Sequence, residues 1–98
     1  MKVQRIEPGT KVPVRLTHEQ RDLILDHTLA GRDLTDRLRV AEADGKRIVV
    51  QYDLDDLDEL LGYIAAEANH SKDKKLQKKL YGLFDLLRRI EDSYTDQD

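Results

Sequence analysis

The last third of the chain carries the feature that most constrains its fold, a row of apolar side chains at alternating steps of four and three residues. The row consists of Leu76, Leu80, Leu83, Leu87, Ile90 and Tyr94. This spacing puts all of them on one face of an α-helix and is typical of the seam between a helix and an antiparallel or coiled-coil partner. The sequence therefore predicts a long helix over about residues 72–92. The spacing leaves open whether the partner helix belongs to the same chain or to a second one.

A second apolar stripe lies just before this seam. Its members fall on one helix face at three- and four-residue spacing and are Leu54, Leu57, Leu60, Leu61, Ile64, Ala65 and Ala68. They predict a helix that is capped by Asp53 and ends near Asn69. At about 100° per residue, the two stripes would be out of phase by about 100° on one continuous helix. We therefore predict a bend at Asn69–Ser71, with Asn69 in the left-handed conformation and Ser71 capping the next helix.

The first half of the chain contains short strand and helix patterns. "VPVRLT" alternates apolar and polar residues and predicts an edge strand at about 12–16, and "RIVVQY" predicts a second strand at 47–52. Thr17 followed by Gln20 is a capping-box pattern, so a helix should begin there and end at Gly31 as a left-handed cap. A short helix is expected at about 33–40, followed by a turn at "EADGK".

These elements predict an α+β fold that is predominantly α-helical. Three to four helices would end in a long antiparallel helical hairpin, with one or two short strands at about 12–16 and 47–52. Ninety-eight residues suit a single small domain over 1–98. Within it, we expect residues 1–11 to form an N-terminal arm, which a short edge strand at 3–6 could begin. We expect residues 93–98 to form a frayed polar tail.

Composition argues against several classes of protein. The chain has no cysteine, which excludes disulfide frameworks, thiolate metal sites and thiol catalysis. It shows no signal-peptide pattern and no apolar run long enough to span a membrane. We therefore expect a cytoplasmic protein without a membrane partner. The net charge of −3 differs from the basic character usual among nucleic-acid binders.

Charge is unevenly distributed along the two C-terminal helices. Residues 53–67 hold six acids and no base, whereas residues 72–89 hold seven bases and two acids. An antiparallel hairpin should set the acidic helix beside the basic one and so help to select which surfaces face each other. The basic run contains Lys72, Lys74, Lys75, Lys78 and Lys79. These are candidate phosphate contacts for a nucleic acid, but a solvated outer face is the favoured interpretation.

Two dipeptides, Gly62-Tyr63 and Tyr81-Gly82, lie mainly on the outer faces of the two predicted helices. A glycine inside a helix costs about 1 kcal/mol relative to alanine, and a solvated surface does not need one. Gly62 and Ala66 would leave a small-residue groove beside Tyr63, and tyrosine is common at interfaces. Gly62, Tyr63, Ala66, Tyr81 and Gly82 are therefore candidate protein-interaction residues, although tolerated glycines without a role are the simpler interpretation.

No pattern points to metal binding, a cofactor or catalysis. His18, His27 and His70 do not stand three or four residues from one another, so no helical metal pair exists. His27 should be partly buried and hydrogen-bonded, and His70 should lie at a helix end. The acids near Asp53 lie at the solvent side of a helix rather than in a pocket. A helix-turn-helix over residues 20–41 is a further possibility, but its second helix is short and of mixed charge.

The sequence thus favours a non-enzymatic protein-protein interaction or accessory module without cofactor or metal. Its expected partner is another protein or a second copy of itself, with self-association through the C-terminal hairpin. The alternative is a nucleic-acid-associated regulator that uses the basic face of the last helix.

Overall fold

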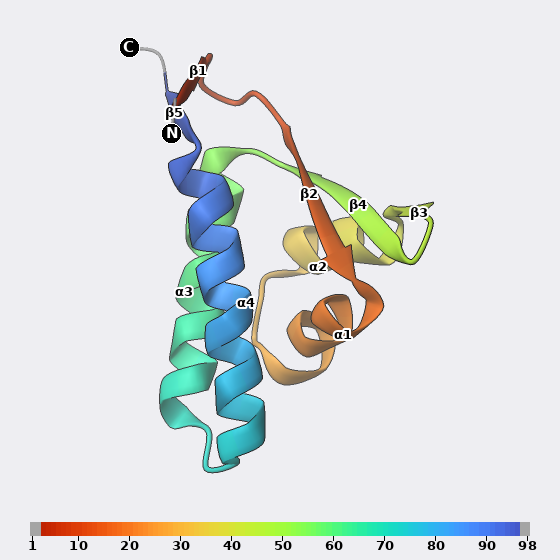
Figure 1. Cartoon of the computed structure of the whole chain (residues 1–98), viewed down its shortest axis with the longest axis vertical. Coiled ribbons are helices and arrows are strands. Elements are labelled where there is room, and N and C mark those ends of the chain that lie inside the picture. Colours follow the sequence, from red (N-terminus) through yellow and green to blue (C-terminus); the bar gives the residue numbers. More distant parts are fainter. Residues whose placement is uncertain (1–2, 97–98) are drawn as a thin grey trace.

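The computed structural model describes residues 3–96, in which a helical hairpin lies beside a small sheet and two shorter helices (Figure 1). The elements in chain order are β1 (Gln4–Ile6), β2 (Val12–Thr17), α1 (His18–His27), α2 (Arg32–Arg39), β3 (Glu42–Asp44), β4 (Arg47–Tyr52), α3 (Leu54–His70), α4 (Lys74–Asp92) and β5 (Tyr94–Asp96). The predicted α+β fold, mainly helical and ending in a long hairpin, is confirmed.

The two predicted strands, β2 and β4, form the main sheet. They pair antiparallel with Val14 opposite Val50, and β3 adds to the other edge of β4. Because side chains alternate along a strand, one face of this pair is apolar and buried. The strand β3 was not predicted, since "EADGK" was expected to be only a turn. The turn is present at Gly45, whose φ of +62° suits glycine, and the residues before it extend back along β4.

The helix α1 begins as predicted but ends earlier. Thr17 and Gln20 form the full capping box, with Gln20 N donating to Thr17 Oγ1 at 3.1 Å. The expectation that Gly31 ends the helix in a left-handed cap is wrong, because its φ is −58° and it stands at the N-cap of α2. The chain leaves the helix at Thr28 instead, whose hydroxyl donates to the Ile24 carbonyl at 2.8 Å. That bond satisfies a carbonyl at the helix end.

The predicted bend between α3 and α4 is confirmed, with different capping residues. Among residues 3–96 no non-glycine residue has a positive φ, so Asn69 is not left-handed. The cap of α4 is Asp73 rather than Ser71, and its carboxylate accepts from the N–H groups of Lys75 and Leu76 at 2.9 and 3.2 Å. A carboxylate accepts these bonds while also favouring the positive end of the helix dipole.

The leucine seam packs within the chain. Leu80, Leu83 and Leu87 are buried, and Leu76, Ile90 and Tyr94 are half-buried against the same core. That core also takes in the apolar face of β2 and β4 and the stripe of α3. The seam therefore has little apolar surface left for a second chain.

The two ends of the described chain pair with each other. The strand β1 runs parallel to β5, with Gln4 opposite Tyr94, and both lie at the end of the hairpin far from its bend (Figure 1). The expectation of a frayed tail is thus wrong for residues 94–96, because Tyr94 packs against the core and holds the chain beside β1. Residues 97 and 98 of the predicted tail, and residues 1 and 2 of the predicted arm, lie outside the described residues.

Candidate interaction surface

The hairpin presents one long face away from the sheet and the shorter helices (Figure 1). Gly62 and Ala66 of α3 and Gly82 of α4 lie on it and are exposed. A Cβ added to Gly62 or to Gly82 would meet no atom within 4 Å outside its own helix and chain neighbours. Neither glycine, then, is needed to let another described part of this chain approach closely.

Tyr81 lies beside these residues and is tied to the neighbouring helix. Its hydroxyl donates to Asn69 Oδ1 at 2.8 Å, which links α4 to the end of α3. Its ring is 43% exposed. The bond holds the ring in place, so Tyr81 offers an aromatic surface at little further entropy cost on binding.

Tyr63 points to a different part of the molecule. Its hydroxyl lies 3.9 Å from the position that a Cβ would take on Gly31, in the link between α1 and α2. The predicted groove of Gly62 and Ala66 beside Tyr63 therefore does not form as one patch. We call the four residues that share the outer face, Gly62, Ala66, Tyr81 and Gly82, the central patch.

Charged residues flank the central patch, and the two helices contribute opposite signs. On α3 the exposed acids Asp55, Asp58 and Glu59 lie toward its start. On α4 the exposed bases include Lys74, Lys78 and Arg89, with the exposed acid Asp85 between them. Within residues 3–96 none of these side chains forms an ion pair. The acidic helix lies beside the basic one as expected, but the antiparallel turn sets these acids beside the far end of α4 and not beside the lysines (Figure 1).

One consequence of this placement is a like-charge contact. Asp58 comes close to Glu91, near the end of α4. Burial of the Glu91 carboxyl, followed by the negative charge of Asp58, raises the pKa of Glu91 above its ordinary value. The hairpin thus concentrates negative charge at this end instead of pairing it.

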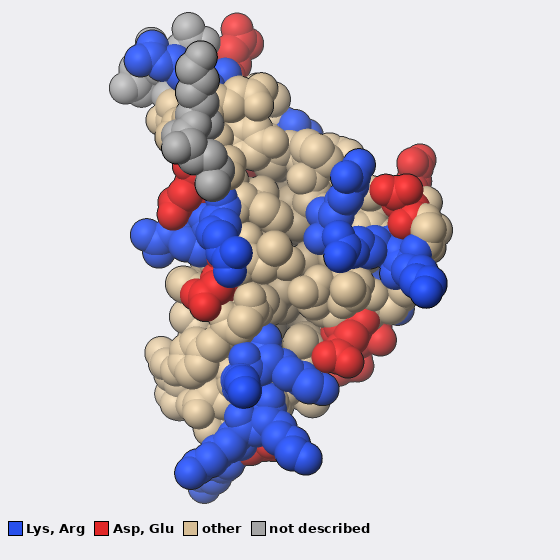
Figure 2. Space-filling view, viewed as in Figure 1, with Lys and Arg blue, Asp and Glu red and all other residues tan. Residues whose placement is uncertain are grey.

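The five candidate lysines gather at the other end of the hairpin, near the bend (Figure 2). All five are exposed. Lys79 pairs with Glu19 of α1 at 3.4 Å, and in the described part of the chain the other four form no ion pair. The cluster is therefore a compact basic tip, which we define as Lys72, Lys74, Lys75, Lys78 and Lys79.

A groove of about 630 Å³ separates the basic tip from α1. One wall carries Glu19, Asp22 and Asp26, and the other carries Lys75 and Lys79. No residue of the central patch lines it. The opposite charges of its two walls face each other, which accounts for the Lys79–Glu19 pair.

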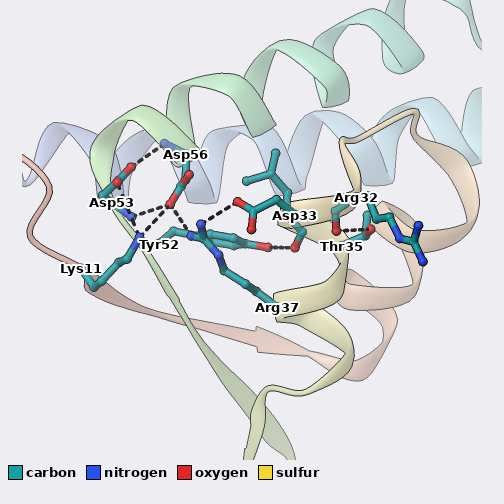
Figure 3. A network of polar contacts seen from close by, with 9 residues as sticks. Lys11, Arg32, Asp33, Thr35, Arg37, Tyr52, Asp53 and Asp56 are labelled. Atoms are coloured by element: carbon teal, nitrogen blue, oxygen red, sulfur yellow. Dashed lines mark hydrogen bonds and ion pairs between the residues drawn. The ribbon is translucent and has the colours of Figure 1, made fainter.

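The sequence did not reveal a polar network that joins α2, β4 and α3 (Figure 3). The Arg37 guanidinium donates to Asp56 and, at 2.6 Å, to Asp33, and it lies 5.6 Å from the ring centre of Tyr52. Lys11 also pairs with Asp56, at 3.5 Å. The partners are 19 and 45 residues apart in sequence, so no local pattern could indicate them.

Burial and charge shift two groups of this network. Burial tends to raise the pKa of Asp56, but the hydrogen bonds from the Asp53 N–H and Arg37 outweigh it and hold that pKa below its ordinary value. Tyr52 is fully buried, and burial raises the pKa of its hydroxyl. That hydroxyl donates to the Leu34 carbonyl at 2.6 Å. The hydrogen-bonding groups of this network are thus paired within the network and with the backbone. Such pairing is typical of a structural contact between elements rather than of a reactive centre.

The histidines also depart in part from expectation. His27 is exposed, so the prediction of partial burial is wrong; the chain turns away from α1 at this point. His70 Nδ1 lies 2.7 Å from the Ala66 carbonyl at the end of α3, as expected of a residue at a helix end. Over residues 3–96, no three or more His, Asp or Glu side chains are grouped so as to hold a metal ion.

No helix within residues 3–96 has both the length and the apolar character required to cross a membrane. Comparison of the chain with protein-family models, with curated proteins and with solved structures finds no match.

Proposed function

We propose that the protein is a non-enzymatic cytoplasmic interaction module that binds another protein chain through the outer face of the α3–α4 hairpin. The observation that carries the proposal is the open space around Gly62 and Gly82. Glycine inside a helix costs about 1 kcal/mol, and neither glycine answers a packing need of the described chain. A second backbone at close range would explain both.

Tyr81 supports the same proposal. Anchor residues of interfaces are often aromatic side chains that are exposed in the free protein and already held in position. Tyr81 meets this description through its bond to Asn69, and its neighbours Gly82 and Ala66 are small. Its ring would provide the main apolar contact with a partner.

Photo-crosslinking in cells tests the proposal. A photo-reactive amino acid in place of Ala66 should give a crosslinked protein product, which Tyr81→Asp should abolish. The matched control replaces Ala43, an exposed alanine of β3 on another part of the surface. The proposal is wrong if position 66 gives no product above that of position 43, provided that circular dichroism shows both variants folded.

The basic tip supports a second candidate function, binding of nucleic acid. Lys72, Lys74, Lys75 and Lys78 form no ion pair within the described residues, and clustered cations bind phosphates by releasing counterions. Binding of a labelled DNA or RNA duplex at low salt should fall steeply with added salt. It should weaken further when Lys74→Glu and Lys78→Glu are combined. No binding of either duplex at low salt would exclude this function.

A further inference from the structure

We propose that the partner is a second copy of this chain, docked hairpin to hairpin about a two-fold axis that runs parallel to the helices. Helix α3 of each copy would then lie on α4 of the other. This inference rests on the proposed function, since it identifies the chain that covers the outer face. It follows from the way in which charge is arranged there.

The outer face carries mainly acids on α3 and mainly bases on α4, where Asp85 and Asp92 are exceptions. Its α3 side is acidic through Asp55, Asp58 and Glu59, and its α4 side is basic through Lys74, Lys78 and Arg89, all exposed. In the described chain these groups have no ion-pair partners. Because Asp58 and Glu59 lie near the start of α3 and Arg89 near the end of α4, the end of the face far from the bend is complementary to itself when one copy is turned about the long axis.

The register within the hairpin decides which residues meet. Gln77 Nε2 donates to the Ala68 carbonyl at 2.7 Å and the Tyr81 hydroxyl to Asn69 Oδ1 at 2.8 Å, so residue numbers at one level of the two helices sum to about the same value. Arg89 is therefore nearly level with Asp58. A two-fold axis parallel to the helices preserves levels, so Arg89 of one copy faces Asp58 and Glu59 of the other.

The remaining residues of the face fit the same arrangement. Tyr81 is level with Ala66, and it would lie against the small residues Gly62 and Ala66 of the second copy. Asp85, the exposed acid in the middle of α4, would lie near Gly62 of that copy, where α3 carries no acid. Asp55 would face the Arg88–Asp92 pair, whose atoms are 3.5 Å apart.

The other face-to-face arrangement is disfavoured by charge. An axis perpendicular to the helices would lay α4 on α4 in opposite directions, with Arg89 near Lys74 and Lys78 of the second copy. Like charges placed opposite each other in an interface oppose docking. The parallel axis instead brings Asp58 and Glu59 of α3 level with Arg89 of α4, whereas Lys74 and Lys78 stay near the bend and away from those acids.

The expected contact is modest in size. Helices of 17 and 19 residues present a face about 25 Å long and about 20 Å wide. The dimer contact would bury on the order of 500 Å² of surface on each copy. The total of about 1,000 Å² is at the lower limit of the areas found in specific protein interfaces. We therefore expect a reversible dimer that salt weakens, because exposed charge pairs are screened.

Sedimentation equilibrium of charge-reversed chains tests the arrangement. Asp58→Lys alone and Arg89→Glu alone should each weaken the dimer by roughly tenfold or more at low salt, since every dimer contains two copies of the reversed contact. A mixture of the two variants should restore a heterodimer, because Asp58 then meets Arg89 at one contact and Lys meets Glu at the other. Glu42→Lys and Lys46→Glu, exposed and distant from the face, are the matched controls and should leave the dimer unchanged.

The outcomes separate this inference from the proposed function. A monomeric wild-type chain at all concentrations, or a mixture that forms no heterodimer, would overturn the second-copy arrangement. If crosslinking at position 66 then captured a chain of different mass, the interaction role would stand with another partner. If position 66 captured nothing and the chain stayed monomeric, both would be wrong.

Discussion

Arg37 connects three elements through a single side chain. It reaches Asp33 on its own helix, Asp56 on α3 and the face of Tyr52 on β4, and it is 28% exposed. Removal of one partner from a half-buried charged network leaves the others poorly satisfied. The side chain therefore stabilises the joint between the hairpin and the sheet.

We expect Arg37→Gln to lower the free energy of unfolding by about 2 kcal/mol, as is usual when a hydrogen bond to a charged group is lost. Urea denaturation would measure the change. Arg39→Gln is the matched control on the same helix, because Arg39 is more exposed and its pairing with Asp36 is local, so it should cost less than about 0.5 kcal/mol. Equal losses in the two variants would contradict the role of Arg37.

Asp56 should make the protein sensitive to acid. Its pKa in the folded protein is below the ordinary value of 3.8, so the folded state favours the ionised carboxylate. The resulting stability is fully present above about pH 4–5 and is lost as pH falls through the folded pKa. The urea midpoint of the wild type should therefore fall between pH 5 and pH 3.

Asp56→Asn isolates this contribution. Its difference in stability from the wild type should be largest near pH 7 and should shrink on acidification, because asparagine does not titrate. Asp55→Asn, a change in an exposed neighbour without an ion pair in the described chain, should keep the wild-type pH profile. A constant difference between Asp56→Asn and the wild type from pH 7 to pH 3 would refute the assignment.

Helical elements with a full apolar period and the two six-residue strands β2 and β4 could be predicted from sequence, while the three-residue strands β3 and β5 could not. The seam of α4 and the phase change near Asn69 were sufficient to indicate the hairpin, because both follow from side-chain spacing. The three-residue strands β3 and β5 lack a pattern of their own and exist through pairing with β4 and β1. The N-caps of α2 and α4, Gly31 and Asp73, were also not predicted. They depend on the direction from which the preceding residues enter each helix.

The helical glycines of the hairpin give a prediction about single elements. Gly82→Ala should raise the free energy of unfolding by about 0.5–1 kcal/mol, because alanine is the better helix former and its methyl group meets open space. Thermal unfolding would show the gain. Gly45→Ala, at a φ of +62°, should instead destabilise the protein.

A loss of stability in Gly82→Ala would show that this glycine has a role inside the fold, which would remove the reason to place a partner there. A gain in stability, combined with weaker dimerisation, is the result expected of a residue kept for close approach of a second chain. The two measurements together therefore test the central patch as well as the helix.

Across the whole molecule, the arrangement of charges depends on which ends of the two helices meet, and counts of charge along each helix do not show it. The opposite net charges of α3 and α4 predicted that an acidic helix lies beside a basic one, but the antiparallel turn separates Asp55 and Asp58 from Lys74 and Lys78 by most of the hairpin length. The acids at the start of α3 that do find bases, Asp53 and Asp56, pair with Lys11 and Arg37 instead. Local charge counts do not specify which ends meet, and the outer face keeps its unpaired groups for that reason.

The pairing of the chain ends gives a prediction at the same scale. A chain that ends at Tyr94 keeps the side chain that packs against the core but loses the register of Arg5 with Thr95 and of Ile6 with Asp96. Backbone amides of residues 5–6 should then exchange their hydrogens faster, whereas the Gln4 amide keeps its bond to the Ser93 carbonyl at 2.9 Å. Those of β2 and β4 should be unaffected because they pair in a separate sheet. Hydrogen exchange followed by mass spectrometry would resolve the two regions. Removal of residues 97–98 alone is the control, and equal protection of residues 5–6 in both shortened chains would mean that β5 does not hold β1 in place.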